Sequence, residues 1–192
     1  MYPRPSTSGS VLRLPPEFYA LDGIHWVYQQ QLITGGNGSA EPTIIVDPQP
    51  NGAYWKVYYL NTGSDNVDLW MAEVDGNRNF LNAQIVYTWP NAGAIANPEV
   101  RNINGVWNLF FNVYANSADI GKTTSASNTG WSAPVEYLIQ NTGPSICATI
   151  APGVFSLTNG QYQMYFGQTP RQTNGSCMLD DQTTMQMWTW QQ

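Results

Sequence analysis

Side chains that could carry acid–base or nucleophilic chemistry are few in this 192-residue sequence. It has a single histidine, His25, which lies in the apolar and aromatic run 24–28. A Ser-His-Asp triad could be built only through this residue, and we interpret it instead as a hydrogen-bonded strand histidine. With one His and two Cys, a four-ligand zinc site would need acidic side chains, and no D-x-D-x-D calcium loop is present. We therefore expect no metal and no cofactor.

Acidic side chains are the other candidates, and several of them lie next to prolines. In the first such segment, strand alternation would place Glu41 and Asp47 on one face. In the second, it would place Asn97, Glu99 and Arg101 on one face. Glu99 and Arg101 would then either form a structural ion pair or contact a ligand.

Composition excludes several classes of protein and partner. Apolar residues make up 42% of the chain and charged residues only 10%, which is the opposite of a disordered sequence. Seven basic residues against thirteen acidic ones give a net charge of −6, so nucleic acid is not an expected partner. No apolar run reaches the roughly 18 residues of a membrane helix, and we expect no membrane insertion.

The two cysteines, Cys147 and Cys177, are predicted to form a disulfide. The chain is rich in Trp, Tyr, Asn and Thr and poor in Lys, a composition typical of extracellular β proteins; two buried free thiols are the alternative. We therefore expect an extracellular protein, or a component of a cell or virion surface. Residues 1–10 are rich in Pro and Ser and lack the apolar segment of a signal peptide. They are predicted to be a flexible leader or linker before a single domain at 11–192.

An internal repeat of about fifty residues occurs three times. Each copy has a proline, a short apolar run, an Asn-Gly turn and an aromatic-rich strand. The glycines of the turns, Gly52, Gly105 and Gly160, lie 53 and 55 positions apart. Asn-Gly between apolar runs is a strong hairpin signal, because both residues tolerate positive φ. Most aromatic residues of the second strands are expected to be core: Tyr58, Tyr59, Phe110, Phe111, Tyr165 and Phe166.

A second hairpin follows in the first two copies, with turns at 75–77 and 127–130. Each copy therefore contains four antiparallel strands, the size of a propeller blade. Residues 16–28 match half a copy, and the third copy ends with a strand at 185–190. The sequence thus predicts an all-β fold, a β-propeller-like array of four-stranded antiparallel blades, with about three full blades plus one partial blade.

This pattern resembles the five-bladed β-propellers of family 43 glycoside hydrolases and their relatives, and so does the outer turn at 127–135. The resemblance covers roughly residues 16–190. It implies that acids at the start of the innermost strands perform hydrolysis, one protonating the departing oxygen while another activates water. The matching positions, each directly before a proline, are Glu41, Asn97 and Ala151. Only Glu41 is an acid, which favours a binding module over an intact hydrolase.

Proteins bind sugars by stacking them on aromatic rings and by hydrogen bonds from carboxylate and amide side chains. Trp89, between a strand end and Pro90, is the predicted platform, and Asn91 lies in the same link. Trp131 is expected to pack beneath its own turn. The predicted carbohydrate contacts are Glu41, Trp89, Asn91, Asn97, Glu99 and Arg101.

Three hypotheses for the function follow. The first is a lectin-like glycan-binding or adhesive module whose partner is a carbohydrate or glycoconjugate. The second is an active glycoside hydrolase that uses Glu41 with Glu99, Asp47 or Glu17. The third is a structural domain that assembles a fibre or filament. Because an incomplete ring leaves strand edges unpaired, we expect a homo-oligomer that covers them, with a compact four-bladed monomer as the alternative.

Overall fold

The computed structural model describes residues 16–19, 27–31, 39–61, 68–114, 118–131, 134–140, 146–157, 160–171 and 184–191. For residues 16–19, 27–31, 39, 40, 61, 190 and 191 only the backbone is described. The leader predicted at 1–10 lies outside these ranges. The described strands are β1 (Pro16–Tyr19), β2 (Val27–Gln31), β3 (Ser39–Val46), β4 (Ala53–Asn61), β5 (Asp68–Asp75), β6 (Phe80–Thr88), β7 (Ala94–Ile103), β8 (Val106–Tyr114), β9 (Ala118–Ser125), β10 (Glu136–Ile139), β11 (Ile146–Ser156), β12 (Gln161–Pro170) and β13 (Thr184–Gln191).

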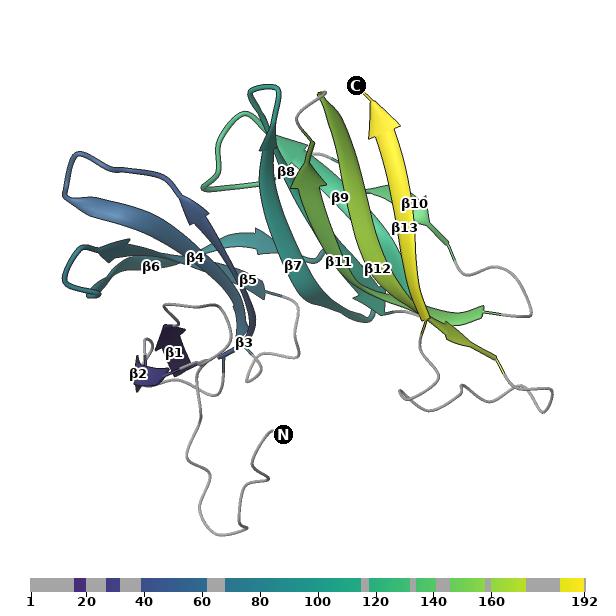
Figure 1. Cartoon of the computed structure of the whole chain (residues 1–192), viewed down its shortest axis with the longest axis horizontal. Helices are drawn as coiled ribbons and strands as arrows, with labels where there is room; N and C mark the ends of the chain where they lie inside the picture. The colour runs from purple at the N-terminus through teal and green to yellow at the C-terminus, as the bar shows by residue number, and fades with distance from the viewer. Residues whose placement is uncertain are drawn as a thin grey trace, which may run out of the picture.

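The strands form antiparallel blades that stand side by side (Figure 1). Blade 1 is β3–β6, blade 2 is β7–β10, and blade 3 contains β11, β12 and β13. A single parallel pair, Ala148 with Ala118, joins β11 of blade 3 to β9 of blade 2. The separate hairpin of β1 and β2 is the predicted partial blade. The all-β, propeller-like array expected from the sequence is therefore confirmed. No helix with the length and hydropathy of a membrane span occurs in the described part of the chain.

The Asn-Gly turns connect the first two strands of each blade, but by two different geometries. In blade 2, Asn104 and Gly105 have φ of 53° and 85°, and the flanking residues Ile103 and Val106 pair directly, so this is a two-residue hairpin. In blade 1 the turn is longer, since the N–H of Gly52 donates to the carbonyl of Gln49 at 3.1 Å. The glycine φ is positive in all three blades, as the predicted hairpins require.

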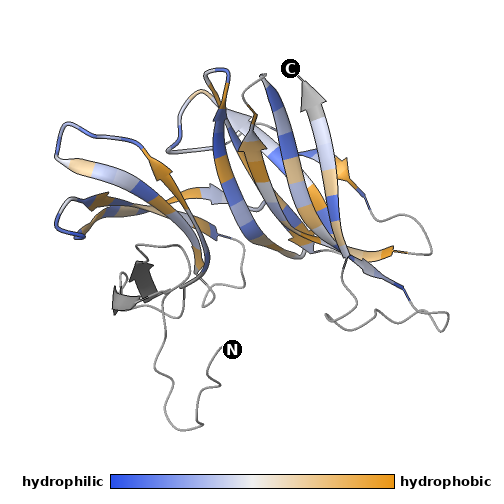
Figure 2. Ribbon diagram, in the orientation of Figure 1, coloured by the Kyte–Doolittle hydropathy of each residue, from blue (hydrophilic) through white to orange (hydrophobic). Residues whose placement is uncertain are grey.

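Blade 2 is buried on both faces because consecutive apolar residues of β8 point to opposite sides of the sheet (Figure 2). On β8, Leu109 and Phe111 pack toward blade 1, whereas Phe110 between them packs toward blade 3. Five of the six aromatic residues predicted to be core are buried, and Tyr165 is partly buried. These two cores hold the inner strands β3, β7 and β11 next to one another, and that arrangement positions the candidate site.

Candidate functional site

The same backbone irregularity occurs on the inner strand of every blade. Glu41, Asn97 and Ala151 have φ of 55°, 48° and 54°, values in the left-handed region. At each of them the register with the neighbouring strand shifts, because the residue and its following proline form a bulge. Such conformations cost on the order of 1–3 kcal/mol for a residue other than glycine and tend to occur at functional sites. Glu41, Asn97 and Ala151, which occupy the same position in the sequence repeat, therefore also have the same backbone conformation.

Hydrogen bonds connect these three bulges in sequence around the inner strands. The carboxylate of Glu41 accepts a hydrogen bond from the backbone N–H of Asn97. The side-chain amide of Asn97 donates to Oδ1 of Asn112 at 3.0 Å, and the N–H of Ala151 donates to the same oxygen at 2.8 Å. Asn112 is fully buried, and its amide donates to the carbonyl of Thr149 at 2.5 Å. Glu41 itself is exposed, so its carboxylate is fixed in position and open to a ligand.

Glu99 joins the inner strands of all three blades. Its carboxylate accepts hydrogen bonds from the Thr43 hydroxyl in blade 1 at 3.0 Å and from the N–H of Val154 in blade 3 at 3.5 Å. Arg101 pairs with it at 2.5 Å and donates from Nε to the carbonyl of Val154 at 2.8 Å. Of the two roles expected for this pair, these contacts support the structural one.

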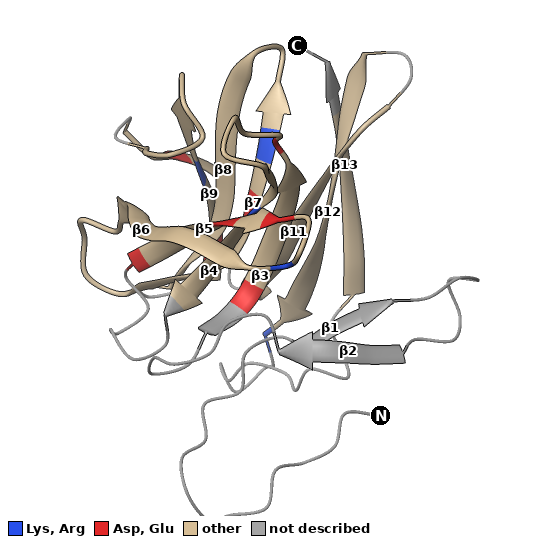
Figure 3. Ribbon diagram, turned by 90° about the vertical axis from the view of Figure 1, so that its left-hand side faces the viewer, with Lys and Arg blue, Asp and Glu red and all other residues tan. Residues whose placement is uncertain are grey.

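The electrostatics of Glu99 follow from its position. Burial raises the pKa of Glu99, while Arg101 and the hydrogen bonds from Thr43 and Val154 act in the opposite direction. Charged residues are sparse on the described strands (Figure 3). Within those same ranges, no group of three or more His, Cys, Asp or Glu residues could hold a metal ion.

Asp47 lies in a different environment from Glu41, contrary to the expected shared face. Its carboxylate pairs with Lys56 at 2.7 Å and accepts a hydrogen bond from the amide of Asn128 at 2.6 Å. Lys56 in turn donates to Oδ1 of Asn128 at 2.7 Å. The bulge at Glu41 interrupts the strict alternation on which the prediction depended. Asp47 therefore binds the outer turn of blade 2 and is not paired with Glu41 for catalysis.

The predicted stacking platform at Trp89 is wrong for this structure. Its side chain is only 4% exposed, and the ring packs edge-on against Phe111 with centroids 5.9 Å apart. The indole N–H donates to the carbonyl of Ala92 at 3.3 Å, so its hydrogen-bond donor is satisfied within the link between the blades. The neighbouring Asn91 is exposed and lines a separate pocket of about 440 Å³ together with Trp131.

The predictions for Trp131 and for the cysteine pair have different outcomes. Trp131 does pack inward, but its ring lies against Tyr58 of blade 1, with centroids 5.8 Å apart, so it fills the interface between blades. Cys147 is buried on β11. Cys177 lies outside the described residues, and the disulfide stays a prediction. The side chain of Glu17, a candidate second acid, also lies outside the description.

Sequence reasoning missed Asn112, the residue that connects two of the bulges. By strand register it corresponds to Leu60 of blade 1, since both lie two residues after the partners of Thr43 and Glu99. The sequence signal was that Asn112 is polar, whereas the equivalent core position of blade 1 holds the apolar Leu60. It also missed Phe155, an aromatic residue of inner strand β11 that is 53% exposed.

Comparisons with known proteins give matches in structure but not in sequence. No protein-family model and no curated protein matches the chain. The α-L-arabinofuranosidase from Lactobacillus brevis is 16% identical with a TM-score of 0.64, covering 86% of this chain and 57% of that chain. A thermostable family-43 glycoside hydrolase is 11% identical with a TM-score of 0.61, covering 85% and 58%. The chain has the β-propeller fold of the family-43 glycoside hydrolases.

A third similar structure, the Penicillium chrysogenum α-L-arabinanase complexed with arabinobiose, is 15% identical with a TM-score of 0.61. The match covers 95% of this chain and 56% of that one. The chain thus spans less than two thirds of the length of these three proteins. At this identity the likeness establishes the fold that the repeats predicted, while the five-blade count stays a prediction.

Proposed function

We propose that this chain is a glycan-binding module that uses a propeller scaffold of the glycoside hydrolase type without its hydrolytic chemistry. The observation that carries the proposal is the left-handed bulge repeated at Glu41, Asn97 and Ala151, of which only Glu41 is acidic. A glycosidase needs one carboxyl group as proton donor and a second as base or nucleophile. The amide of Asn97 and the methyl group of Ala151 supply neither.

The remaining polar groups suit recognition of hydroxyl groups. Glu41 presents an exposed carboxylate that the N–H of Asn97 orients, and such charge-assisted hydrogen bonds are stronger than neutral ones. Asn97 is partly exposed, and its amide is held by the buried Asn112. Rigid support of this kind reduces the entropy lost when a ligand binds. The hydrolase alternative lacks a described second acid beside Glu41, since Glu99 and Asp47 are both committed to ion pairs.

An extracellular or surface location accompanies this proposal. It is supported by the low Lys content, the pair of cysteines and the net charge of −6, and by the carbohydrate ligand of the arabinanase neighbour. A role in assembly is compatible with the same fold.

Titration calorimetry with arabinobiose, together with a glycan array, tests the proposal. We expect saturable binding without release of reducing sugar. Glu41→Gln keeps the shape of the side chain and removes its charge, so binding should weaken about tenfold. Asn97→Gly keeps the left-handed backbone and removes the amide, with a similar expected loss. Glu73→Gln, which removes a charge near the far end of blade 1, is the matched control and should bind like the parent.

Two outcomes would contradict the proposal. One is the absence of binding to any glycan at millimolar concentration. The other is release of reducing sugar that Glu41→Gln abolishes, which would make the protein a hydrolase.

A further inference from the structure

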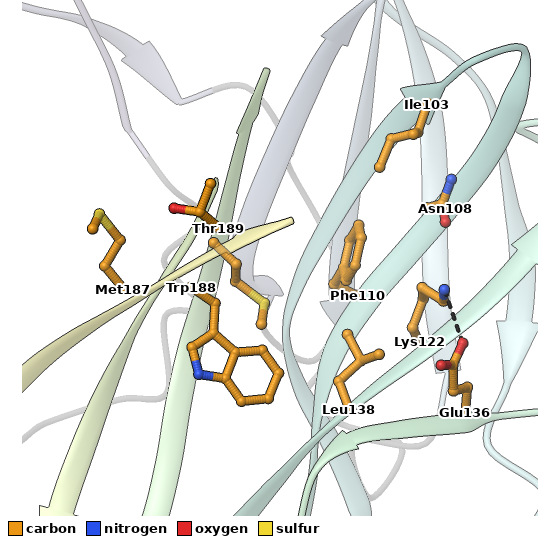
Figure 4. A pocket seen from close by; sticks show the side chains of 10 residues that line it. Ile103, Asn108, Phe110, Lys122, Glu136, Leu138, Met187, Trp188 and Thr189 are labelled. Carbon is orange, nitrogen blue, oxygen red and sulfur yellow. Dashed lines mark ion pairs between the residues drawn. The ribbon is translucent and has the colours of Figure 1, made fainter. Parts of the chain in front are cut away.

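A pocket of about 560 Å³ lies between blade 2 and blade 3, and none of the three bulge residues lines it (Figure 4). Its volume is within the range of about 300–1,000 Å³ that is usual for small-molecule sites. Phe110 lines the pocket but is only 1% exposed, because it belongs to the core between the two blades. The accessible walls are therefore formed by Trp188, Leu138 and the ion pair of Lys122 with Glu136.

Trp188 is the exposed aromatic wall of the pocket. It pairs with Met164 across the sheet, and its ring lies edge-on to Phe166 with centroids 5.9 Å apart. Met164 and Phe166 belong to the core between blades 2 and 3, so the indole lies on the face of β13 that is directed at blade 2. The residue is nevertheless 45% exposed. The pocket thus offers accessible aromatic surface on which a flat apolar group can stack.

The interface between blades 1 and 2 shows how the equivalent position is closed elsewhere in the fold. By strand register, Phe110 of blade 2 corresponds to Tyr58 of blade 1. The outer turn of blade 2 covers Tyr58, since the carbonyl of Asn128 accepts a hydrogen bond from its hydroxyl at 2.9 Å and the ring of Trp131 packs against its ring. The described residues of blade 3 include no such turn beside Phe110, and the space there is the pocket.

The charged groups of the pocket suit a neutral ligand that carries hydroxyl groups. Among its described lining residues, Lys122 and Glu136 alone are charged, and their ion pair at 2.8 Å leaves no net charge. Their side chains are 18% and 61% exposed, so a ligand can reach both. An ammonium has three N–H donors and a carboxylate accepts several hydrogen bonds, so both keep capacity beyond their mutual contact. An anion would meet no uncompensated cation here, and a wholly apolar ligand would bury the ion pair without supplying hydrogen bonds.

We propose that this pocket is a second saccharide-binding site, in which the apolar face of a sugar ring stacks on Trp188 and its hydroxyl groups bond to Lys122 and Glu136. Leu138 adds an apolar contact from blade 2. The choice of a saccharide as ligand rests on the proposed function, whereas the residues of the pocket are independent of those at the bulges. The module is then bivalent for a polymeric glycan, which strengthens binding wherever one chain reaches both sites.

Titration of the full chain with arabinobiose, followed by calorimetry and by amide and indole chemical shifts, tests the inference. We expect a second binding event with a Kd on the order of 1 mM, and shifts at Lys122, Glu136 and Trp188. Trp188→Ala should weaken binding at the pocket about tenfold. Glu136→Gln removes the charge of one acceptor and should weaken it about three- to tenfold. The shifts beside Glu41 should stay in both variants.

Phe155→Ala is the matched control, because it removes an aromatic residue that is 53% exposed and lies outside the pocket. Since Trp188 also packs on Phe166, Glu136→Gln is the variant that leaves the packing of blade 3 intact. Absence of shifts at the pocket, unchanged pocket shifts in both variants, or an equal loss in Phe155→Ala would each overturn the inference.

Glu41→Gln separates this inference from the proposed function. Pocket shifts that persist in Glu41→Gln support the second site, also where the bulges themselves bind no sugar. Pocket shifts that disappear in Glu41→Gln would mean that the protein has one site only, and would overturn the inference while leaving the proposed function in place.

Discussion

Glu41 and Asn97 occupy the same position in two successive blades, and the carboxylate of the first accepts a hydrogen bond from the backbone N–H of the second. This bond is available because both residues are in the left-handed region, which turns the N–H of Asn97 out of its own strand ladder. The candidate site is thus assembled from equivalent backbone positions of different repeats. The chemistry of the site depends on which side chain each repeat has at that position.

Replacing Ala151 with glycine should stabilise the protein. Ala151 has a φ of 54°, which is unfavourable for a residue with a Cβ, and only its N–H bonds to Asn112. Relief of about 1–2 kcal/mol of strain exceeds the entropy cost of glycine, so the free energy of unfolding should rise by about 0.5–1 kcal/mol in urea titrations. Ala94→Gly, on β7 with φ outside the left-handed region, is the control and should lower it. A fall in both variants would show that Ala151 is not strained.

The strand pattern was predictable because it depends on local signals. Asn104-Gly105 lies between two apolar runs, and that arrangement fixes a hairpin with little influence from the rest of the chain. The spacing of the three Asn-Gly pairs then gave the blade size. The left-handed bulges were not predictable in this way. A residue before proline favours extended backbone, so Glu41, Asn97 and Ala151 violate the local preference and depend on contacts between blades.

The site residues were predicted less well than the fold, because their environment depends on contacts between residues that are far apart in the sequence. Trp89 lies in a link that looks exposed in the sequence, yet Phe111, more than twenty positions later, covers its ring. Asn112 reads as one polar residue in an apolar strand, and its role depends on two N–H donors from other strands. Glu41 was identified because two local features sufficed: it directly precedes a proline of the repeat, and it is acidic.

Charge neutralisation at Asp47 should destabilise the protein more than removal of Lys56. The Lys56 side chain is 4% exposed and that of Asp47 is 24% exposed, so the ammonium depends more on its partner. Asp47→Asn leaves a buried cation and should cost about 2–4 kcal/mol of unfolding free energy. Lys56→Met leaves a partly hydrated carboxylate that still bonds to Asn128 and should cost less. The reverse order, measured in urea at neutral pH, would show that the pair is not organised around the lysine.

A disulfide between Cys147 and Cys177 should be detectable by thiol titration of the denatured, unreduced chain, which we expect to show no reactive thiol. A closed loop of this length restricts the unfolded chain, so reduction should lower the unfolding free energy by roughly 3–4 kcal/mol. Cys177→Ser should destabilise the protein similarly and expose one thiol, that of the buried Cys147. Two reactive thiols in the unreduced parent would rule out the disulfide.

The stability of the protein should fall with rising pH through the titration of Glu99. Burial raises the pKa of Glu99 and outweighs Arg101, so the folded state holds the proton more tightly than the unfolded state. The resulting stabilisation is complete below the ordinary glutamate pKa of about 4.3 and is lost as the pH rises through the raised value. Thermal unfolding should therefore favour Glu99→Gln over the parent increasingly as the pH rises above the ordinary glutamate pKa. Arg101→Met removes the opposing charge and should extend the fall to higher pH, whereas a trend of opposite sign would mean that Arg101 dominates.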